Sequence, residues 1–169
     1  VNFGIVYGQQ AYGLSQTLDI PQSEAAEMIR AYFEAYPQVR AFLDGIVEEA
    51  AKTGYAETMF GRKRRIPELK SSNRNVRAQG ERTAMNHPMQ GAAADIIKMA
   101  MVEVERRLRE SGFASSMILQ VHDELDFSAA QDEVDALATM VKEVMESIVD
   151  LEVPLMVDVR WAPNWAEAH

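Results

Sequence analysis

Two short apolar runs flank a polar segment, residues 120–124, in the C-terminal half of the chain. Ser116–Leu119 precedes this segment and Leu125–Phe127 follows it. This arrangement predicts two strands joined by a tight turn, which would hold Asp123 and Glu124 at the tip of a hairpin. Paired carboxylates on a rigid element suit Mg²⁺, a cation that takes oxygen ligands and keeps part of its coordination shell for phosphates and water. A turn that binds nothing is the alternative interpretation.

The first eight residues place two aromatic side chains four positions apart. Phe3 and Tyr7 would share one face of a helix, and Gly4 and Gly8 beside them would leave room for close approach. Two aromatic rings on such a face form a stacking surface for a flat ring, such as a nucleic-acid base. The alternative is an aromatic stripe in a hydrophobic core.

Together with a third segment, these two features resemble the DNA polymerases of family A, the bacterial DNA polymerase I type. Residues 1–8 resemble the family's nucleotide-binding helix, and residues 120–125 (Gln-Val-His-Asp-Glu-Leu) resemble its second metal-binding motif. Residues 81–98, which begin Glu-Arg-Thr-Ala-Met-Asn-His-Pro-Met-Gln-Gly, match a segment between them. The resemblance implies a DNA-directed DNA polymerase that uses Mg²⁺, deoxynucleoside triphosphates and a primed template in two-metal phosphoryl transfer.

The resemblance also implies roles for single residues. Asp123 would bind a metal ion, Glu124 would be a weaker or outer ligand, and His122 would lie near the primer terminus; these three form the expected catalytic set. Phe3 and Tyr7 match the nucleotide-binding positions beside the incoming sugar and the templating base. A histidine beside an aspartate otherwise serves as a structural hydrogen-bond partner.

Three polar residues match positions that contact primer–template DNA near its growing end. They are Arg82, Asn86 and Gln90, spaced four apart, so that they follow one side of a helix. The minor groove presents nearly the same acceptors in every base pair, so donors placed there sense pair geometry without reading sequence. Exposed polar positions on a helix are the alternative for each residue alone.

Two parts of the family's site have no counterpart in these residues. The first metal-binding aspartate and the arginine and lysine that grip the triphosphate would precede Val1, and Asp19 and Asp44 lack the apolar strand flanks to replace that aspartate. The chain also opens on Val1, inside a motif. The resemblance therefore implies a C-terminal fragment covering part of the fingers and part of the palm, inactive by itself.

Positive charge is concentrated in one segment of an acidic chain. Residues 60–90 hold eight Lys or Arg against two Glu, a charge of +6. Because the whole chain has a net charge of −9, the residues outside this segment carry −15. A local basic stripe on an acidic body can follow a phosphate backbone. A solvated loop and helix face is the alternative.

Proline, glycine and apolar periodicity predict a helix-rich α+β fold with two lobes. The resemblance implies that these lobes are partial fingers helices (residues 1–85) and a partial palm (86–169) whose β-hairpin carries the metal aspartate. Apolar stripes at helical spacing predict core positions, among them Tyr36, Phe42, Leu43, Ala50, Val104 and Leu108. In the first half of the chain we expect helices over 1–8 and 11–18, a helix that begins at Pro21, a helix over Pro37–Gly54 and a strand over Tyr55–Phe60. A long helical tract should follow over 72–112, kinked or broken at His87-Pro88. After the hairpin we expect a helix begun by a capping box at Ser128–Gln131 and a last strand over Pro154–Arg160.

Composition excludes some classes and leaves others open. The chain has no cysteine, which excludes disulfides and thiolate metal sites, and no run near the roughly 20 apolar residues of a membrane span. A cytoplasmic protein is expected. A non-catalytic nucleic-acid-binding module, or one that associates with itself through apolar surface, remains the alternative function. A metal-dependent nuclease would need more clustered acids than Asp123 and Glu124.

Overall fold

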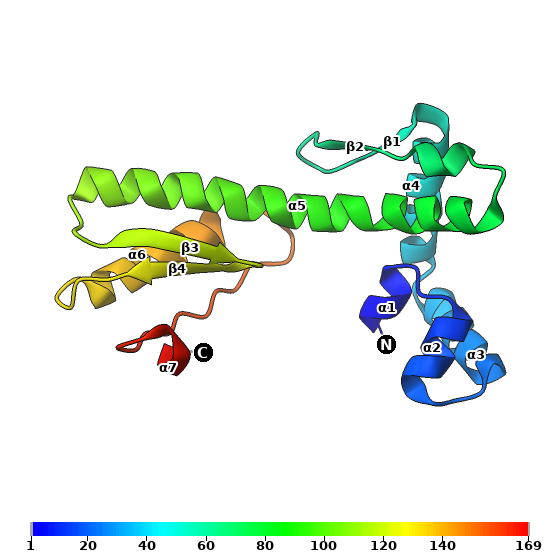
Figure 1. Ribbon diagram of the computed structural model, residues 1–169, viewed down its shortest axis with the longest axis horizontal. Coiled ribbons are helices and arrows are strands. Elements are labelled where there is room, and N and C mark those ends of the chain that lie inside the picture. The colour runs from blue at the N-terminus through cyan, green and yellow to red at the C-terminus, as the bar shows by residue number, and fades with distance from the viewer. Residues whose placement is uncertain (1, 169) are drawn as a thin grey trace. The chain divides into compact units, whose positions relative to one another are not determined.

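The computed structural model describes residues 2–168, except for the side chain of Phe3. These residues form mostly helices with two small antiparallel sheets, which confirms the predicted α+β class (Figure 1). Two compact units are present, Val1–Ala92 and Ala93–His169. The long helix α5 (Arg74–Ser111) contributes residues to both.

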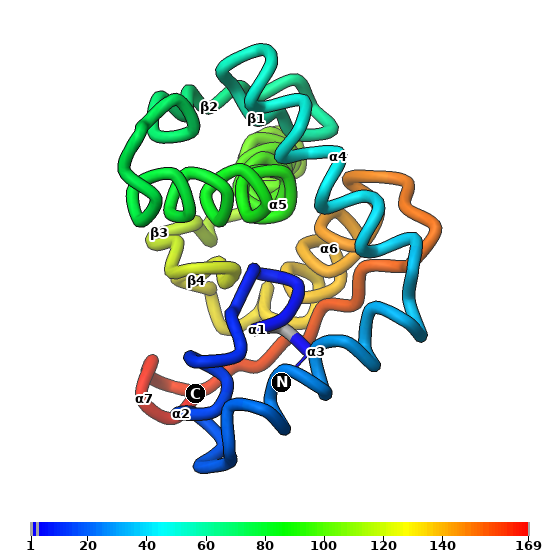
Figure 2. The backbone as a smooth tube through the Cα atoms, turned by 90° about the vertical axis from the view of Figure 1, so that its right-hand side faces the viewer, coloured from blue at the N-terminus to red at the C-terminus, as the bar shows by residue number. Residues whose placement is uncertain are grey.

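The N-terminal unit begins with helices whose ends follow proline and glycine. Pro37 occupies the first turn of α4, where its missing N–H costs nothing, and Gly54 ends that helix at a φ of 84°. Helices α2 and α3 pack side by side (Figures 1 and 2). The bounds of these helices are α1 (Asn2–Val6), α2 (Ala11–Leu18), α3 (Gln22–Ala35) and α4 (Pro37–Thr53).

A short hairpin and a single 3₁₀ turn lead into α5. Strand β1 (Tyr55–Glu57) pairs with β2 (Lys63–Arg65), and η1 (Pro67–Lys70) follows. The strand expected over Tyr55–Phe60 ends early because the backbone turns at Thr58. The core of this unit brings together small and apolar side chains from α4, the hairpin and α5, namely Ala50, Ala56, Ile66 and Ala84.

The sequence predicted a kink or a break at His87-Pro88, and the break was wrong. Helix α5 runs from Arg74 to Ser111 with Pro88 inside it. An internal proline costs a helix about 3 kcal/mol. On either side of Pro88, Ala84 lies in the core of this unit and buried Gly91 packs against Thr58, so tertiary contacts hold both flanks of the proline.

The C-terminal unit packs the rest of α5 and α6 (Val134–Ser147) against a hairpin of β3 (Ser116–Val121) and β4 (Glu124–Ser128) (Figure 1). Its core holds the predicted positions Val104 and Leu108 together with Leu137, Val141 and Val144. Partly buried Met117 and Phe127 cover this core from the hairpin. A short helix α7 (Trp165–Ala168) ends the described chain.

The predicted capping box was wrong, because α6 begins at Val134 and not after Ser128. Glu133 precedes the helix, but its carboxylate is used elsewhere. Its Oε1 accepts the N–H of Ala114 at 2.9 Å and its Oε2 accepts the N–H of Ser115 at 2.9 Å. The acidic side chain thus fastens the start of α6 to the segment before β3.

The last strand predicted over Pro154–Arg160 was also wrong, since no strand is assigned in this stretch. A strand needs a neighbouring strand to accept its N–H groups. Here the N–H of Val157 donates to Oε1 of Glu146 on α6, at 2.9 Å. Among residues 2–168, no helix is long and apolar enough to cross a membrane.

Candidate functional site

The β3–β4 hairpin places His122 and Asp123 in a two-residue turn. Val121 pairs with Glu124 across the turn, as the apolar runs on either side predicted. His122 has a φ of 53°, in the left-handed region, and its carbonyl accepts a hydrogen bond from the side-chain amide of Gln120. His122, Asp123 and Glu124 are all exposed, so their polar groups are accessible to a ligand.

Asp126 stands beside an irregularity of this hairpin. It faces Leu119, where the register shifts between Met117 and Leu119. Its Oδ2 atom is buried and accepts no hydrogen bond from any described residue. A buried carboxylate oxygen without a partner is costly, so this oxygen is a local weak point of the hairpin.

Helix α1 ends at the aromatic pair. Phe3 lies on α1, although its side chain is outside the described part of the structure, and half-buried Tyr7 directly follows the last helical residue. Gly8, at a φ of 79°, donates its N–H to the carbonyl of Ile5, and Gln9 donates to the carbonyl of Gly4. These two bonds form a Schellman motif, which ends the helix immediately after Tyr7.

Arg82, Asn86 and Gln90 lie on the uninterrupted helix α5, so their four-residue spacing puts them along one side of it. Arg82 and Asn86 are half-buried and Gln90 is exposed. Arg82 donates to Oε1 of Gln79 at 2.5 Å. The Oδ1 atom of Asn86 is buried and has no hydrogen-bond partner within residues 2–168.

The structure brings the end of α1 onto this part of α5. A Cβ atom added at Gly8 would lie 2.6 Å from Cε of Met85 and 3.3 Å from Cγ of Arg82. Glycine at position 8 therefore allows the end of α1 to pack closely against α5. Gly8 and Arg82, which come from two separate motifs, are therefore neighbours within the N-terminal unit, whereas the His122–Glu124 turn belongs to the C-terminal unit.

One residue of the middle motif was missed by sequence reasoning. His87 is 8% exposed, and its Nε2 atom lies 3.2 Å from the carbonyl oxygen of Arg62. A signal for it existed: His87 and Gly91 are four residues apart, which puts a small residue and a polar ring on one helix face. Nothing in the sequence identified the partner, 25 residues earlier.

The part of the chain that the structure describes contains no cluster of three His, Asp or Glu side chains able to hold a metal ion. Asp123 can contribute a carboxylate to an oxygen-rich site, which is the ligand type that Mg²⁺ prefers. Because the side chain is exposed on a hairpin tip, further ligands can approach it from solvent.

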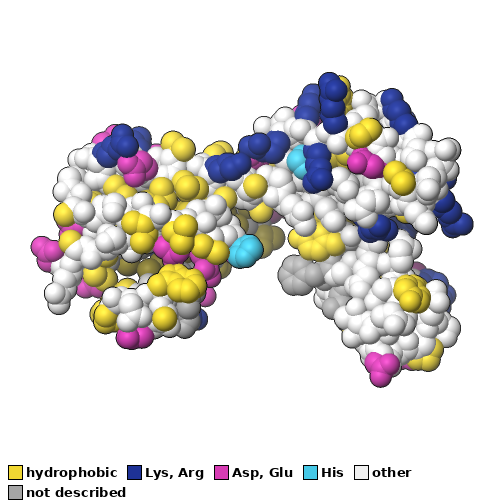
Figure 3. Space-filling view, in the orientation of Figure 1, with side chains coloured by type: hydrophobic (Ala, Val, Ile, Leu, Met, Phe, Trp, Pro, Cys, Tyr) yellow, Lys and Arg dark blue, Asp and Glu magenta, His cyan; other side chains and the backbone are white. Residues whose placement is uncertain are grey.

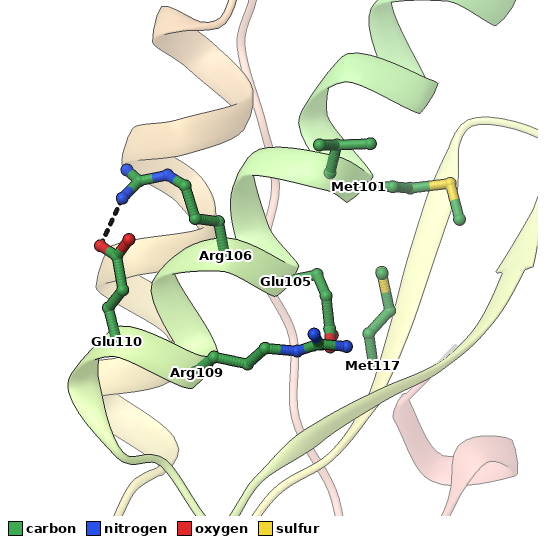
Figure 4. Close-up of a pocket in the computed structure, with 7 residues that line it drawn as sticks. Met101, Glu105, Arg106, Arg109, Glu110 and Met117 are labelled. Atoms are coloured by element: carbon green, nitrogen blue, oxygen red, sulfur yellow. Dashed lines mark hydrogen bonds and ion pairs between the residues drawn. The ribbon is translucent and has the colours of Figure 1, made fainter.

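A shallow groove of about 630 Å³ lies between the end of α5 and β3, away from the hairpin turn (Figure 4). Met101, Val102 and Met117 form its apolar part. Its charged side chains pair along α5, with Arg106 bonded to Glu110 and Arg109 to Glu105. Arg106, helped by Arg107, also lowers the pKa of nearby Glu103 to about 2. None of the predicted site residues lines the groove.

Comparison with known proteins supports the resemblance seen in the motifs. The family described as DNA polymerase family A matches residues 1–167. DNA polymerase I of Geobacillus stearothermophilus is 51% identical over 168 residues, which cover 99% of this chain and 19% of that protein. The thermostable DNA polymerase I of Thermus aquaticus is 46% identical, over 99% of this chain and 20% of its own length.

A solved structure shares the fold. It is the POL domain of Pol1 from M. smegmatis in complex with DNA primer–template and dNTP, and it superposes with a TM-score of 0.94 at 44% identity. The match covers 99% of this chain and 30% of that one. The chain thus spans about a fifth of the length of the curated relatives it matches.

Proposed function

Because the chain belongs to DNA polymerase family A, we propose that it forms part of a DNA-directed DNA polymerase. The enzyme would add deoxynucleotides to the 3′ end of a primer by two-metal phosphoryl transfer. The observation that carries this proposal is the family match over residues 1–167, with 51% identity to a DNA polymerase I. Residues 1–85 would belong to the fingers and residues 86–169 to the palm.

Asp123 is the residue we assign to metal binding. It sits on a rigid two-residue turn, its carboxylate is exposed, and Glu124 follows it at the start of β4. Bound Mg²⁺ would supply charge stabilisation for the attacking and leaving oxygens. Asp123 would hold the ion, Glu124 would be an outer or weak ligand, and His122 would lie near the primer terminus.

Phe3 and Tyr7 would bind the incoming nucleotide. Tyr7 stands at the capped end of α1, where the Schellman motif fixes its backbone. An aromatic ring held in this way can stack on a sugar or base without losing much side-chain freedom. The contact of Gly8 with Arg82 and Met85 links this position to the proposed DNA-contacting side of α5.

Arg82, Asn86 and Gln90 would contact the minor groove of the newest base pairs. Their donors suit the acceptors shared by all base pairs there. Primer–template DNA and deoxynucleoside triphosphates are therefore the proposed partners.

Primer extension tests this proposal. The protein expressed from its complete reading frame should extend a labelled primer in the template's order when Mg²⁺ and the four deoxynucleoside triphosphates are present. Addition of EDTA should stop the reaction and excess Mg²⁺ should restore it. Binding of primer–template without any extension would instead favour the alternative, a non-catalytic nucleic-acid-binding module.

A further inference from the structure

The base of the β3–β4 hairpin is closed by hydrogen bonds that the proposed mechanism does not use. Oε2 of Glu133 accepts the N–H of Ser115, at 2.9 Å, and also its hydroxyl. The hydroxyl oxygen accepts the N–H of Ala130 at 3.0 Å, and the carbonyl of Ala130 accepts the N–H of Glu133 at 2.9 Å. Oε1 of Glu133 accepts the N–H of Ala114 at 2.9 Å. These four residues, Ala114, Ser115, Ala130 and Glu133, are here called the hairpin clamp.

The clamp lies where the chain enters and leaves the hairpin. Ser115 directly precedes β3, and Ala130 is two residues beyond the end of β4. Glu133 directly precedes α6. Ser115 is 6% exposed, so its polar groups would be left without partners if the clamp opened. The clamp therefore fastens both ends of the hairpin to the start of one helix.

The contacts between this hairpin and the core of its unit lie close to the clamp. Met117 and Phe127, which face each other near the start of the hairpin, pack against that core. Ile118 and Leu119 are 63% and 52% exposed, and hydrophobic side chains show at the surface of this part of the C-terminal unit (Figure 3). Within residues 2–168, no hydrophobic residue nearer the turn packs against this core. The direction of the hairpin is therefore set near its base.

The length of the hairpin amplifies any movement at its base. Strand β3 has 6 residues and a strand rises about 3.3 Å per residue, so the turn lies about 20 Å from the clamp. A tilt of about 3° at the base would then move Asp123 by about 1 Å. A misplacement of about 1 Å can lower a catalytic rate by about 10²-fold. The clamp is thus placed where a small change has a large effect on the turn.

We propose that Glu133 and Ser115 are positioning residues, which hold the β3–β4 hairpin so that Asp123 lies where the polymerase reaction needs it. The proposal rests on the proposed function, because it concerns the same turn. Neither clamp residue reaches the reacting atoms, since both act through the backbone of the hairpin. Breaking the clamp should therefore slow incorporation and weaken metal binding. It should spare the contacts assigned to nucleotide and DNA, because Tyr7 and Arg82 belong to the N-terminal unit.

The test compares Ser115→Ala with Ser147→Ala in the protein from its complete reading frame. The first variant loses a hydroxyl of the clamp, whereas the hydroxyl of Ser147 bonds to a carbonyl within its own helix, that of Glu143. Ser115→Ala should lower the incorporation rate at saturating nucleotide by at least about tenfold and raise the half-saturating concentration of Mg²⁺. The nucleotide KM and the primer–template Kd should stay unchanged. Ser147→Ala should match the unaltered protein in all four quantities.

Two further measurements separate positioning from general damage. Hydrogen exchange over residues 116–128 should accelerate in Ser115→Ala, at a temperature well below its unfolding, while α5 keeps its protection. Glu133→Gln should give the same kinetic pattern, because either orientation of its amide sets the NH₂ group against an N–H of Ala114 or Ser115. The double variant should be no slower than the slower single variant, since both changes break the same clamp.

The proposal is overturned if Ser115→Ala and Glu133→Gln incorporate nucleotide at the unaltered rate, or if hydrogen exchange over the hairpin stays unchanged. It is equally overturned if these variants lose nucleotide or primer–template affinity as much as they lose rate, or if their effects multiply in the double variant. In each case, extension that the unaltered protein performs and Asp123→Ala abolishes leaves the proposed function in place. An unaltered protein that extends no primer overturns both.

Discussion

Glu133 and Ser115 form a two-point contact in which Oε2 of the carboxylate accepts both the N–H and the hydroxyl of the serine. The serine oxygen in turn accepts the N–H of Ala130 at 3.0 Å. The contact joins the start of α6 to the segment before β3, so it stabilises the unit that carries the His122–Glu124 turn.

This contact predicts a pH-dependent stability. The Ser115 hydroxyl, followed by the Ala114 N–H, lowers the pKa of Glu133 below its ordinary value of 4.5. A carboxyl whose pKa falls on folding contributes stability above the unfolded pKa and loses it as pH falls through the folded one. Glu133→Gln should therefore lower the melting temperature at neutral pH, and the difference from the unaltered protein should shrink below about pH 4.5.

Thermal unfolding followed by circular dichroism over a pH series measures this difference. Glu152→Gln, at an exposed position after α6, serves as the control and should have no such pH dependence. A Glu133→Gln deficit of equal size at every pH would show that the carboxylate charge is not what the contact needs.

Replacing Asp123 should change the rate of nucleotide incorporation without changing the affinity for primer–template DNA. Asp123→Ala should abolish single-turnover incorporation but leave primer–template affinity nearly intact, because affinity for duplex rests mainly on phosphate contacts. Rapid-quench kinetics and fluorescence anisotropy measure the two quantities, with Asp132→Ala as a nearby exposed control. A variant that keeps more than roughly a tenth of the rate, a loss under about 1.4 kcal/mol, is not missing a principal metal ligand.

The polypeptide of these 169 residues is predicted to have no polymerase activity of its own. Within the described residues, Asp123 has no cluster of further ligands to hold a metal pair, and two-metal catalysis requires both ions in place. A primer-extension assay on the purified chain checks this. Template-dependent extension that survives repurification and disappears in Asp123→Ala would contradict the prediction.

The groove contacts predict a loss in extension rate. Arg82→Ala or Gln90→Ala should slow extension of matched primers by an amount equivalent to about 1–3 kcal/mol, since each leaves a partner without its hydrogen bond. Nucleotide affinity should change less, because Phe3 and Tyr7 are assigned to the nucleotide. Pre-steady-state kinetics on matched and mismatched termini separate the two effects. Weaker nucleotide binding with unchanged extension from both termini would make these residues surface polar groups.

Much of the fold could be predicted because it is encoded locally. Pro37 and Gly54 mark the ends of α4, and the two apolar runs define the β3–β4 hairpin and its turn. Apolar periodicity correctly identified Leu43, Ala50, Val104 and Leu108 as buried, but it was wrong for Tyr36 and Phe42, which are 56% and 58% exposed. These signals need no knowledge of distant partners.

The errors depend on residues far apart in the chain. Pro88 remains helical because packing holds α5 on both sides, and the predicted cap at Ser128 fails because Glu133 bonds to residues 18 and 19 positions earlier. The same holds for the site: motifs identify Asp123 and Arg82, but the bond between His87 and Arg62 depends on tertiary structure. The roles assigned to all of these residues remain predictions.

The left-handed backbone at His122 restricts which residue types fit at this position without strain. A non-glycine residue at a φ of 53° costs about 1–2 kcal/mol relative to glycine, which adopts that conformation freely. Selection of a random library at position 122 for heat resistance alone should therefore enrich glycine and asparagine. Selection for primer extension should keep histidine if its imidazole serves the primer end. The composition of the two surviving pools would then separate a residue kept for its backbone from one kept for its side chain.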